Sequence, residues 1–534
     1  MCQNSHKVNH SWGRFLSPEQ ELRVMYLSGG EKMGALRARY NFLFKSTKGL
    51  ILVAIALIAL VTAIWGMISG PMAEFGVRDL VIRTFGMDLV EAEREGRIIL
   101  LYHAIAMAVV AIEVYIITDM VPMKVHQQTN INAIITFGYM VSLVFGLLFG
   151  YFGHNFIFHG LYIFGLSLMF FGGLQLAFAL WPWKKEYYAR DPVYSQTRTG
   201  IDLERVAFFT MAVATLGSAL FGAVTGSYWG NGHETFLAED LIREPEKTIL
   251  QNSIIGHLHI MLTLIAIGIT LIVGRWQDFR GPLHKIAMPF MIVGTIIISL
   301  GAWSVVLVEW AHTIIYGGSV LVMLAALFFV IFSWRQLIHR GIEKRGSPKA
   351  SFRQKLSALL EDPLKFGVGW QMVFMNFTVS GVGIFMAAKL DEIFRVWPHR
   401  EERIVLTGHW HILSAIIATI ILLYYADLAG LKGKIRKIFG WSVIIFSDLA
   451  FAAATIFSMK RLIVSESAQQ PLVNWTMLLV DLGLAVVLVA LALLMIWRLA
   501  DLFKKRGRWA EEFDQTAYPE IESHDSAITG EQQA

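Results

Sequence analysis

Residues 403–427 read RIVLTGHWHILSAIIATIILLYYAD, with two histidines near the start followed by a long apolar run. A helix needs about 20 such residues to cross a hydrocarbon core of roughly 30 Å. A lipid-exposed segment has to satisfy its own backbone hydrogen bonds, and a helix does so internally. This stretch therefore predicts a membrane-spanning helix that carries histidines close to one mouth.

Apolar runs of similar length recur through the rest of the chain. Of its 534 residues, 55% are hydrophobic and 16% charged, and the mean hydropathy is +0.54. A soluble chain of this length would carry more charge. We predict about twelve spans by the length criterion. They lie at 48–70, 97–120, 131–152, 155–181, 204–227, 250–275, 283–307, 310–335, 368–390, 404–427, 436–458 and 474–500.

These spans predict an all-α integral membrane protein with three parts. A polar, basic segment, 1–47, precedes the membrane domain, 48–500, and a polar tail, 501–534, follows it. The first 48 residues do not have the pattern of a cleavable signal peptide. The sole cysteine, Cys2, excludes intrachain disulfides, iron–sulfur clusters, cysteine zinc sites and covalently attached haem.

Charge in the loops predicts the orientation. Basic residues cluster before the first span and after the fourth, eighth, tenth and twelfth, whereas the loops around 88–95 and 234–246 are acidic. By the positive-inside rule, both termini are cytoplasmic. The net charge of +5 belongs to these loops and does not indicate nucleic acid. We expect a multi-pass protein of the cytoplasmic (inner) membrane of a prokaryote, with the lipid bilayer as a partner.

A repeat of four spans runs through the chain. The first, fifth and ninth spans are rich in glycine, and the span after each places a histidine six residues after a polar residue: Arg97 and His103, Gln251 and His257, Arg403 and His409. Self-similarity at a fixed period points to a repeat architecture. We predict a pseudo-threefold bundle of three four-helix units.

The histidines of these spans share one depth near the outer mouth. Two further histidines, His259 and His411, follow His257 and His409 by two residues. Residues i and i+2 differ by about 200° around a helix, so such a pair serves two sites and not one metal ion. Neutral imidazole suits haem iron, and an apolar pocket suits the porphyrin. For His154, His159 and His312 a structural role is an equal alternative.

The pattern resembles catalytic subunit I of the haem–copper oxidase superfamily, particularly its nitric oxide reductase branch. The segments that carry the resemblance are Ser380-Gly-Val-Gly383, Gly408-His-Trp-His411 and Asp119-Met-Val-Pro-Met123. The similarity covers about residues 48–500. The strongest motifs lie in the second and tenth spans.

This resemblance implies a ligand set for haem. His103 and His411 would be the two axial ligands of a low-spin haem, and His409 would bind a second haem. Lys460 and Arg461 would bind the haem propionates. Two haems of the b type are expected, with a third if the second histidine of the sixth span binds one with His159 or His312.

The chain also departs from the family. The seventh span lacks the adjacent histidine pair that holds the second metal, and its only histidine is His284 at the inner mouth. Met261 and Thr263 stand four residues after His257 and His259, where the oxidases have a tyrosine. We therefore expect no copper. His409 with His257 or His259 would form a closed bis-histidine site.

The expected function is that of a respiratory membrane cytochrome that transfers electrons between quinol and an outer-face cytochrome or other redox subunit. No catalytic residue is assigned. Two alternatives stay open. One is a terminal oxidase or nitric oxide reductase with an atypical second metal site. The other is a haem-free twelve-span transporter, although transporter repeats usually number two.

Overall fold

The structure is a computed structural model. It describes residues 31–69, 76–86, 94–151, 156–189, 197, 199–229, 249–346, 350–504, 507 and 509–510. Cys2, His154 and the acidic loop around 234–246 lie outside the described residues. Contacts divide the chain into two units, one made of its two ends and one made of residues 51–495.

The unit formed by the chain ends contains α2 (Glu31–Lys45) and the start of α3 (Thr47–Ser69). Ser46 separates these helices, and its side chain accepts a hydrogen bond of 3.1 Å from the backbone of Gly49. A serine at this position satisfies one of the unpaired N–H groups at a helix start. The guanidinium of Arg39 lies 5.5 Å from the ring centre of Trp509.

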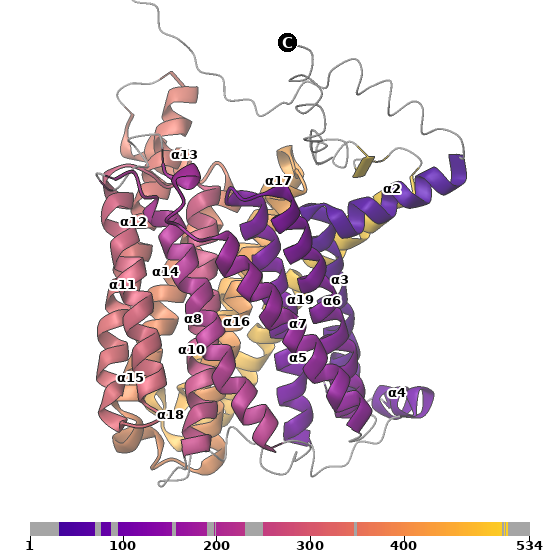
Figure 1. Cartoon of the computed structure of the whole chain (residues 1–534). Coiled ribbons are helices and arrows are strands. Elements are labelled where there is room, and N and C mark those ends of the chain that lie inside the picture. The colour runs from indigo at the N-terminus through magenta and orange to yellow at the C-terminus, as the bar shows by residue number, and fades with distance from the viewer. Residues whose placement is uncertain are drawn as a thin grey trace, which may run out of the picture. The chain divides into compact units, whose positions relative to one another are not determined.

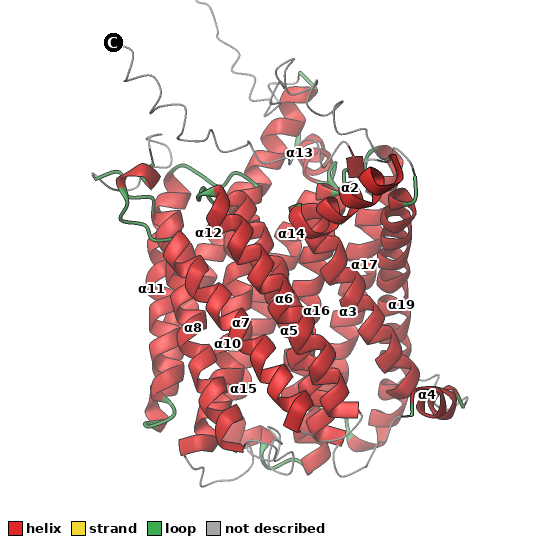
Figure 2. Cartoon of the chain, turned by 45° about the vertical axis from the view of Figure 1, so that its right-hand side comes forward, coloured by secondary structure: helices red, strands yellow, loops and turns green. Residues whose placement is uncertain are grey.

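The unit of residues 51–495 is a bundle of long helices that run side by side (Figures 1 and 2). Among the described residues, the short helices α4 (Val77–Phe85), α13 (Phe352–Leu359) and α18 (Lys460–Ile463) lie in its connections. The helices of its spans are α5 (Arg94–Met120), α6 (Val125–Tyr151), α7 (Phe156–Ala179), α8 (Leu203–Trp229), α10 (Ile249–Trp276), α11 (Pro282–Ser304), α12 (His312–Lys344), α14 (Pro363–Val373), α15 (Ser380–Ala388), α16 (His399–Leu428) and α17 (Gly433–Ser458), together with the greater parts of α3 and α19 (Gln469–Leu502).

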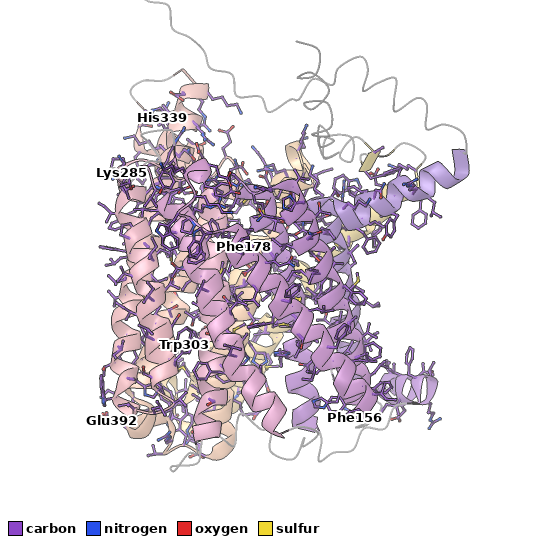
Figure 3. All side chains as sticks on the ribbon, viewed as in Figure 1. Phe156, Phe178, Lys285, Trp303, His339 and Glu392 are labelled. Carbon is purple, nitrogen blue, oxygen red and sulfur yellow. The ribbon has the colours of Figure 1, made fainter. Side chains whose placement is uncertain are left out.

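Each predicted span coincides with a helix, so the all-α, multi-pass membrane class is confirmed. Eleven helices in the described residues are long and apolar enough to cross a membrane. The sixth predicted span is α10, whose uninterrupted described apolar stretch is Ile260–Trp276. Lys285 and His339 lie near one end of the bundle and Phe156 and Glu392 near the other (Figure 3), as successive antiparallel spans require.

The ninth predicted span is the irregular one. Between α14 and α15 the backbone forms a π-helix, η5, over Phe374–Val379, and a second one, η6, over Leu390–Phe394. Asn376 donates its side-chain amide to the carbonyl of Met372, and Ser380 donates its hydroxyl to that of Met375. Polar side chains that bond to a helix's own carbonyls can bend or widen it.

Glycine brings helices together at equivalent places in the three predicted repeats. In each repeat the fourth span presents a glycine to a backbone carbonyl of the third span, so close that an added Cβ would lie within 3.0 Å of that oxygen. The contacts are Gly165 to Gly138 at 2.8 Å, Gly318 to Gly294 at 3.0 Å and Gly483 to Phe446 at 2.5 Å. Small residues that allow backbones to approach closely are typical of membrane helix interfaces.

A network of ion pairs and one indole hydrogen bond joins four helices at one end of the bundle. Arg436 of α17 binds both carboxylate oxygens of Asp362, which caps α14, at 2.8 Å each. It also donates to Asp427 of α16 at 2.5 Å, and the indole of Trp276 on α10 donates to the same carboxylate at 3.0 Å. Bidentate arginine–carboxylate pairs are among the stronger polar contacts in proteins.

We expect Gly165→Val to destabilise the protein by about 3 kcal/mol, because the new side chain would overpack the interface between α6 and α7. The measurement is reversible unfolding in mixed micelles. Gly160→Val is the matched control on the same helix, since no described residue lies within 4 Å of a Cβ built there. Equal effects of the two substitutions would show that backbone approach does not hold these helices together.

We expect Arg436→Ala to lower the free energy of unfolding by about 3 kcal/mol, because it leaves two partly buried carboxylates without their cation. Lys437→Ala removes an exposed neighbouring cation and should change the same free energy by less than about 0.5 kcal/mol. Equal changes in the free energy of unfolding for the two variants would contradict this prediction.

Candidate functional site

The histidines singled out from the sequence lie on three helices of the bundle. His103 is on α5, His257 and His259 are on α10, and His409 and His411 are on α16. Each stands in the first half of its helix. The side chain of His259 is outside those that the structure describes, and the roles expected for it stay predictions.

The structure brings His103 and His257 together. Helices α5 and α10 contact each other, and the two imidazole centres lie 6.4 Å apart with their planes tilted by 40°. Two imidazoles on opposite sides of one metal ion have centres about 6 Å apart, because each metal–nitrogen bond is about 2 Å long. The spacing therefore suits one shared metal.

Each ring of this pair is held through its Nδ1 atom. The hydroxyl of Tyr162 on α7 lies 2.5 Å from Nδ1 of His103, and Nδ1 of His257 donates to the carbonyl of Ser218 on α8 at 2.9 Å. A carbonyl only accepts, so the neutral ring of His257 carries its lone pair on Nε2. A second hydrogen bond of this kind is typical of metal-binding histidines.

Glycine on a neighbouring helix makes room for two of the rings. A Cβ added to Gly222 of α8 would lie 2.6 Å from Cε1 of His257, and one added to Gly383 of α15 would lie 2.7 Å from Cε1 of His409. The two glycines belong to the fifth and ninth predicted spans. The repeat seen in the sequence therefore extends to a glycine that faces the histidine of the next span.

His411 contacts Tyr102. Its Nε2 atom bonds to the hydroxyl of Tyr102, and the ring centres of these residues are 5.2 Å apart. The pairing of His103 with His411 stays a prediction.

His409 lines a small cavity between α15, α16 and α17. Its other walls include Thr378 and Val379 of the π-helix, Met386 and Ser458. The enclosed space is about 20 Å³, roughly the volume that one water molecule occupies. The expected role of His409 as ligand of a second haem stays a prediction.

Two further histidines with an expected role, His159 and His312, differ in their surroundings. His159 stacks on Phe149 with ring centres 5.1 Å apart. His312 is exposed at the start of α12. A third haem ligated by either of them stays a prediction.

Lys460 and Arg461 were expected to bind propionates. Lys460 is buried, with only 4% of its surface exposed, and its ammonium pairs with the carboxylate of Glu401 on α16. The guanidinium of Arg461 lies 5.8 Å from the ring centre of Trp397. Glu401 was not anticipated because it stands 59 residues from Lys460 in the chain.

Three carboxylates that lie within long helices are Glu113, Asp448 and Asp481. Asp448 accepts from the Trp370 indole at 2.6 Å and from the Gln371 amide at 2.9 Å, so hydrogen bonds to a neighbouring helix satisfy it. Asp481 is exposed. Glu113 of α5 is 5% exposed and faces α10, where a Cβ on Gly268 would lie 3.0 Å from its Oε2.

Sequence reasoning missed Tyr162, Ser218 and Gly222, which hold or face the His103–His257 pair. The signal for Gly222 was present in the glycine-rich fifth span. The comparisons with known proteins add nothing to this site: no family model, no curated protein and no solved structure matches the chain.

We expect Lys460→Met to lower the free energy of unfolding by about 3 kcal/mol, because Glu401 would lose its cation in a partly buried position. The double variant Lys460→Met with Glu401→Gln should recover part of that loss. Lys389→Met is the matched control, because its pair with Glu392 is largely exposed and is worth under about 1 kcal/mol. Strictly additive single effects would contradict a buried ion pair.

Proposed function

We propose that this protein is a membrane cytochrome of the respiratory type, which holds b-type haem between α5 and α10 and carries electrons through the bilayer. His103 and His257 would hold the haem iron. The observation that carries the proposal is their spacing of 6.4 Å, with Nδ1 of each ring already bonded to Tyr162 or Ser218.

The number of protein ligands in the pair, two, favours haem over a bare metal ion. Within the described residues there is no group of three or more histidine, cysteine or acidic side chains that could hold a metal ion. Structural zinc takes four protein ligands and catalytic zinc takes three. Two histidines suffice where a porphyrin supplies the remaining ligands.

The protein's own residues determine how such a centre would behave. Bound haem supplies one-electron transfer. Tyr162 and Ser218 fix the orientation of the two rings, and Nε2 is the ring nitrogen left for iron. With both histidines holding it, the haem would supply electron transfer and not gas reduction.

The proposed partners follow from the proposed topology. With both termini in the cytoplasm of a prokaryote, the histidine pair lies toward the outer face of the inner membrane. Electrons would then pass between the quinol pool and an outer-face cytochrome or other redox subunit. The basic loops at one end and the acidic loops at the other support this orientation.

The test is a reduced-minus-oxidised spectrum of the purified full-length protein, with a haem count per chain and a repeat under carbon monoxide. We expect a b-type spectrum without a carbon monoxide shift. A shift would indicate an open site and favour the oxidase or reductase alternative. Absence of a Soret band would leave the transporter alternative and end the haem proposal.

Ligand variants test the assignment. His103→Gly and His257→Gly should each remove the same haem signal, and added imidazole should restore part of it by occupying the space left. His411→Gly should keep that signal. His339→Gly, at an exposed position on α12, is the control. Loss of the signal in His103→Gly and His411→Gly, but not in His257→Gly, would replace this pair by the one that the family resemblance implies.

A further inference from the structure

A second cavity is lined by residues other than the histidines of the candidate site. It measures about 410 Å³ and lies where α7 and α10 end and α8 begins. Its wall carries six charged side chains: Arg205, Arg275, Glu186, Asp202, Glu204 and Asp278. Both signs of charge meet in one space that is large enough for a small organic group.

Internal pairs neutralise part of this wall. Arg275 binds Glu204 at 2.5 Å, and Asp278 binds Arg280 at 3.1 Å. Outside these pairs, two acids, Glu186 and Asp202, and one cation, Arg205, face the cavity. The wall holds two cations and four carboxylates, so a guest that brings positive charge is favoured.

Arg205 offers the complementary anion contact. It is 2% exposed and donates to the carbonyls of Pro122 at 2.7 Å and Ala179 at 2.5 Å. Its guanidinium stacks 3.7 Å from the ring centre of Tyr187. Its Nε atom is buried without a hydrogen-bond partner among the described residues. One donor of a buried cation is therefore left for an anionic oxygen.

Tyr187 lies beside Arg205 and joins it to Glu186. Burial raises the pKa of Tyr187, and the neighbouring Glu186 raises it further. The phenol hydroxyl therefore keeps its proton at neutral pH and donates it in a hydrogen bond to Glu186, which holds the carboxylate at the cavity wall. A guest that matches this wall has one anionic end, near Arg205, and one ammonium end, near Glu186 and Asp202.

The position of the cavity at the ends of the spans indicates that the guest is part of a lipid. Helices that span the membrane end or begin at its wall. Beside it, Trp181 and Trp183 are 43% and 49% exposed, and both pack edge-on against Phe209 of α8. Exposed tryptophans at span ends are typical of the headgroup level of a bilayer. The cavity thus lies where phospholipid headgroups lie.

We propose that this cavity binds the headgroup of a phospholipid that carries both a phosphate and a primary ammonium, the phosphatidylethanolamine class. The phosphate bonds to Arg205. The ammonium donates to Glu186 and Asp202. A metal ion does not account for the wall, because the described residues hold no group of three potential ligands.

The test measures lipid binding to the delipidated, purified full-length protein by native mass spectrometry, with a thermal shift in parallel. The probes are phosphatidylethanolamine, phosphatidylcholine, which lacks ammonium protons, and phosphatidylglycerol, which lacks the ammonium. We expect phosphatidylethanolamine to bind about tenfold more tightly than either, the effect of one charge-assisted hydrogen bond. Equal binding of the three lipids overturns the proposal.

Variants locate the site. Glu186 is exposed, so Glu186→Gln should fold normally and weaken phosphatidylethanolamine binding about tenfold, with phosphatidylglycerol unaffected. Glu343→Gln, at an exposed acid on α12, is the matched control. An unchanged preference in Glu186→Gln refutes the assignment. Stabilisation by soluble phosphoethanolamine without any by the lipid would also refute it, because the guest would then not come from the bilayer.

Discussion

Backbone groups inside hydrocarbon have no water to bond, and this constraint precedes every other feature of the molecule. It requires helices, and it leaves helix association to close packing and polar contacts, since lipid tails are as apolar as leucine. The glycine contacts of Gly165, Gly318 and Gly483 provide the close packing. The network around Arg436 provides polar contacts at one end of the bundle.

The same close packing shapes the histidine site. Gly222 lets α8 approach the ring of His257, and the nearby Ser218 carbonyl on that helix binds its Nδ1 atom. The hydroxyl of Tyr162 on α7 likewise bonds to the Nδ1 atom of His103. The pair thus depends on four helices, two that carry the rings and two that hold them. Such support from outside the ligand pair is what keeps an imidazole in a fixed orientation.

Much of the fold could be predicted because a span's length follows directly from the thickness of the bilayer. The histidine positions could be predicted too, since ionisable residues are rare in such runs. The pairing of His103 with His257 could not. It depends on which helices touch, and that is set by side-chain fit such as Gly222 against His257. The periodicity of the sequence also does not identify Glu401 as the partner of Lys460, because the two residues lie far apart in the chain.

The π-helix of residues Phe374–Val379 has a consequence for helical phase. A π-turn contains one residue more than an α-turn, and each residue turns the chain by about 100°. Everything C-terminal to η5 is therefore rotated relative to α14. Gly383 faces His409 only in this rotated register. A one-residue deletion that converted η5 into α-helix would leave the length of the span almost unchanged, yet it would direct another side chain at that ring.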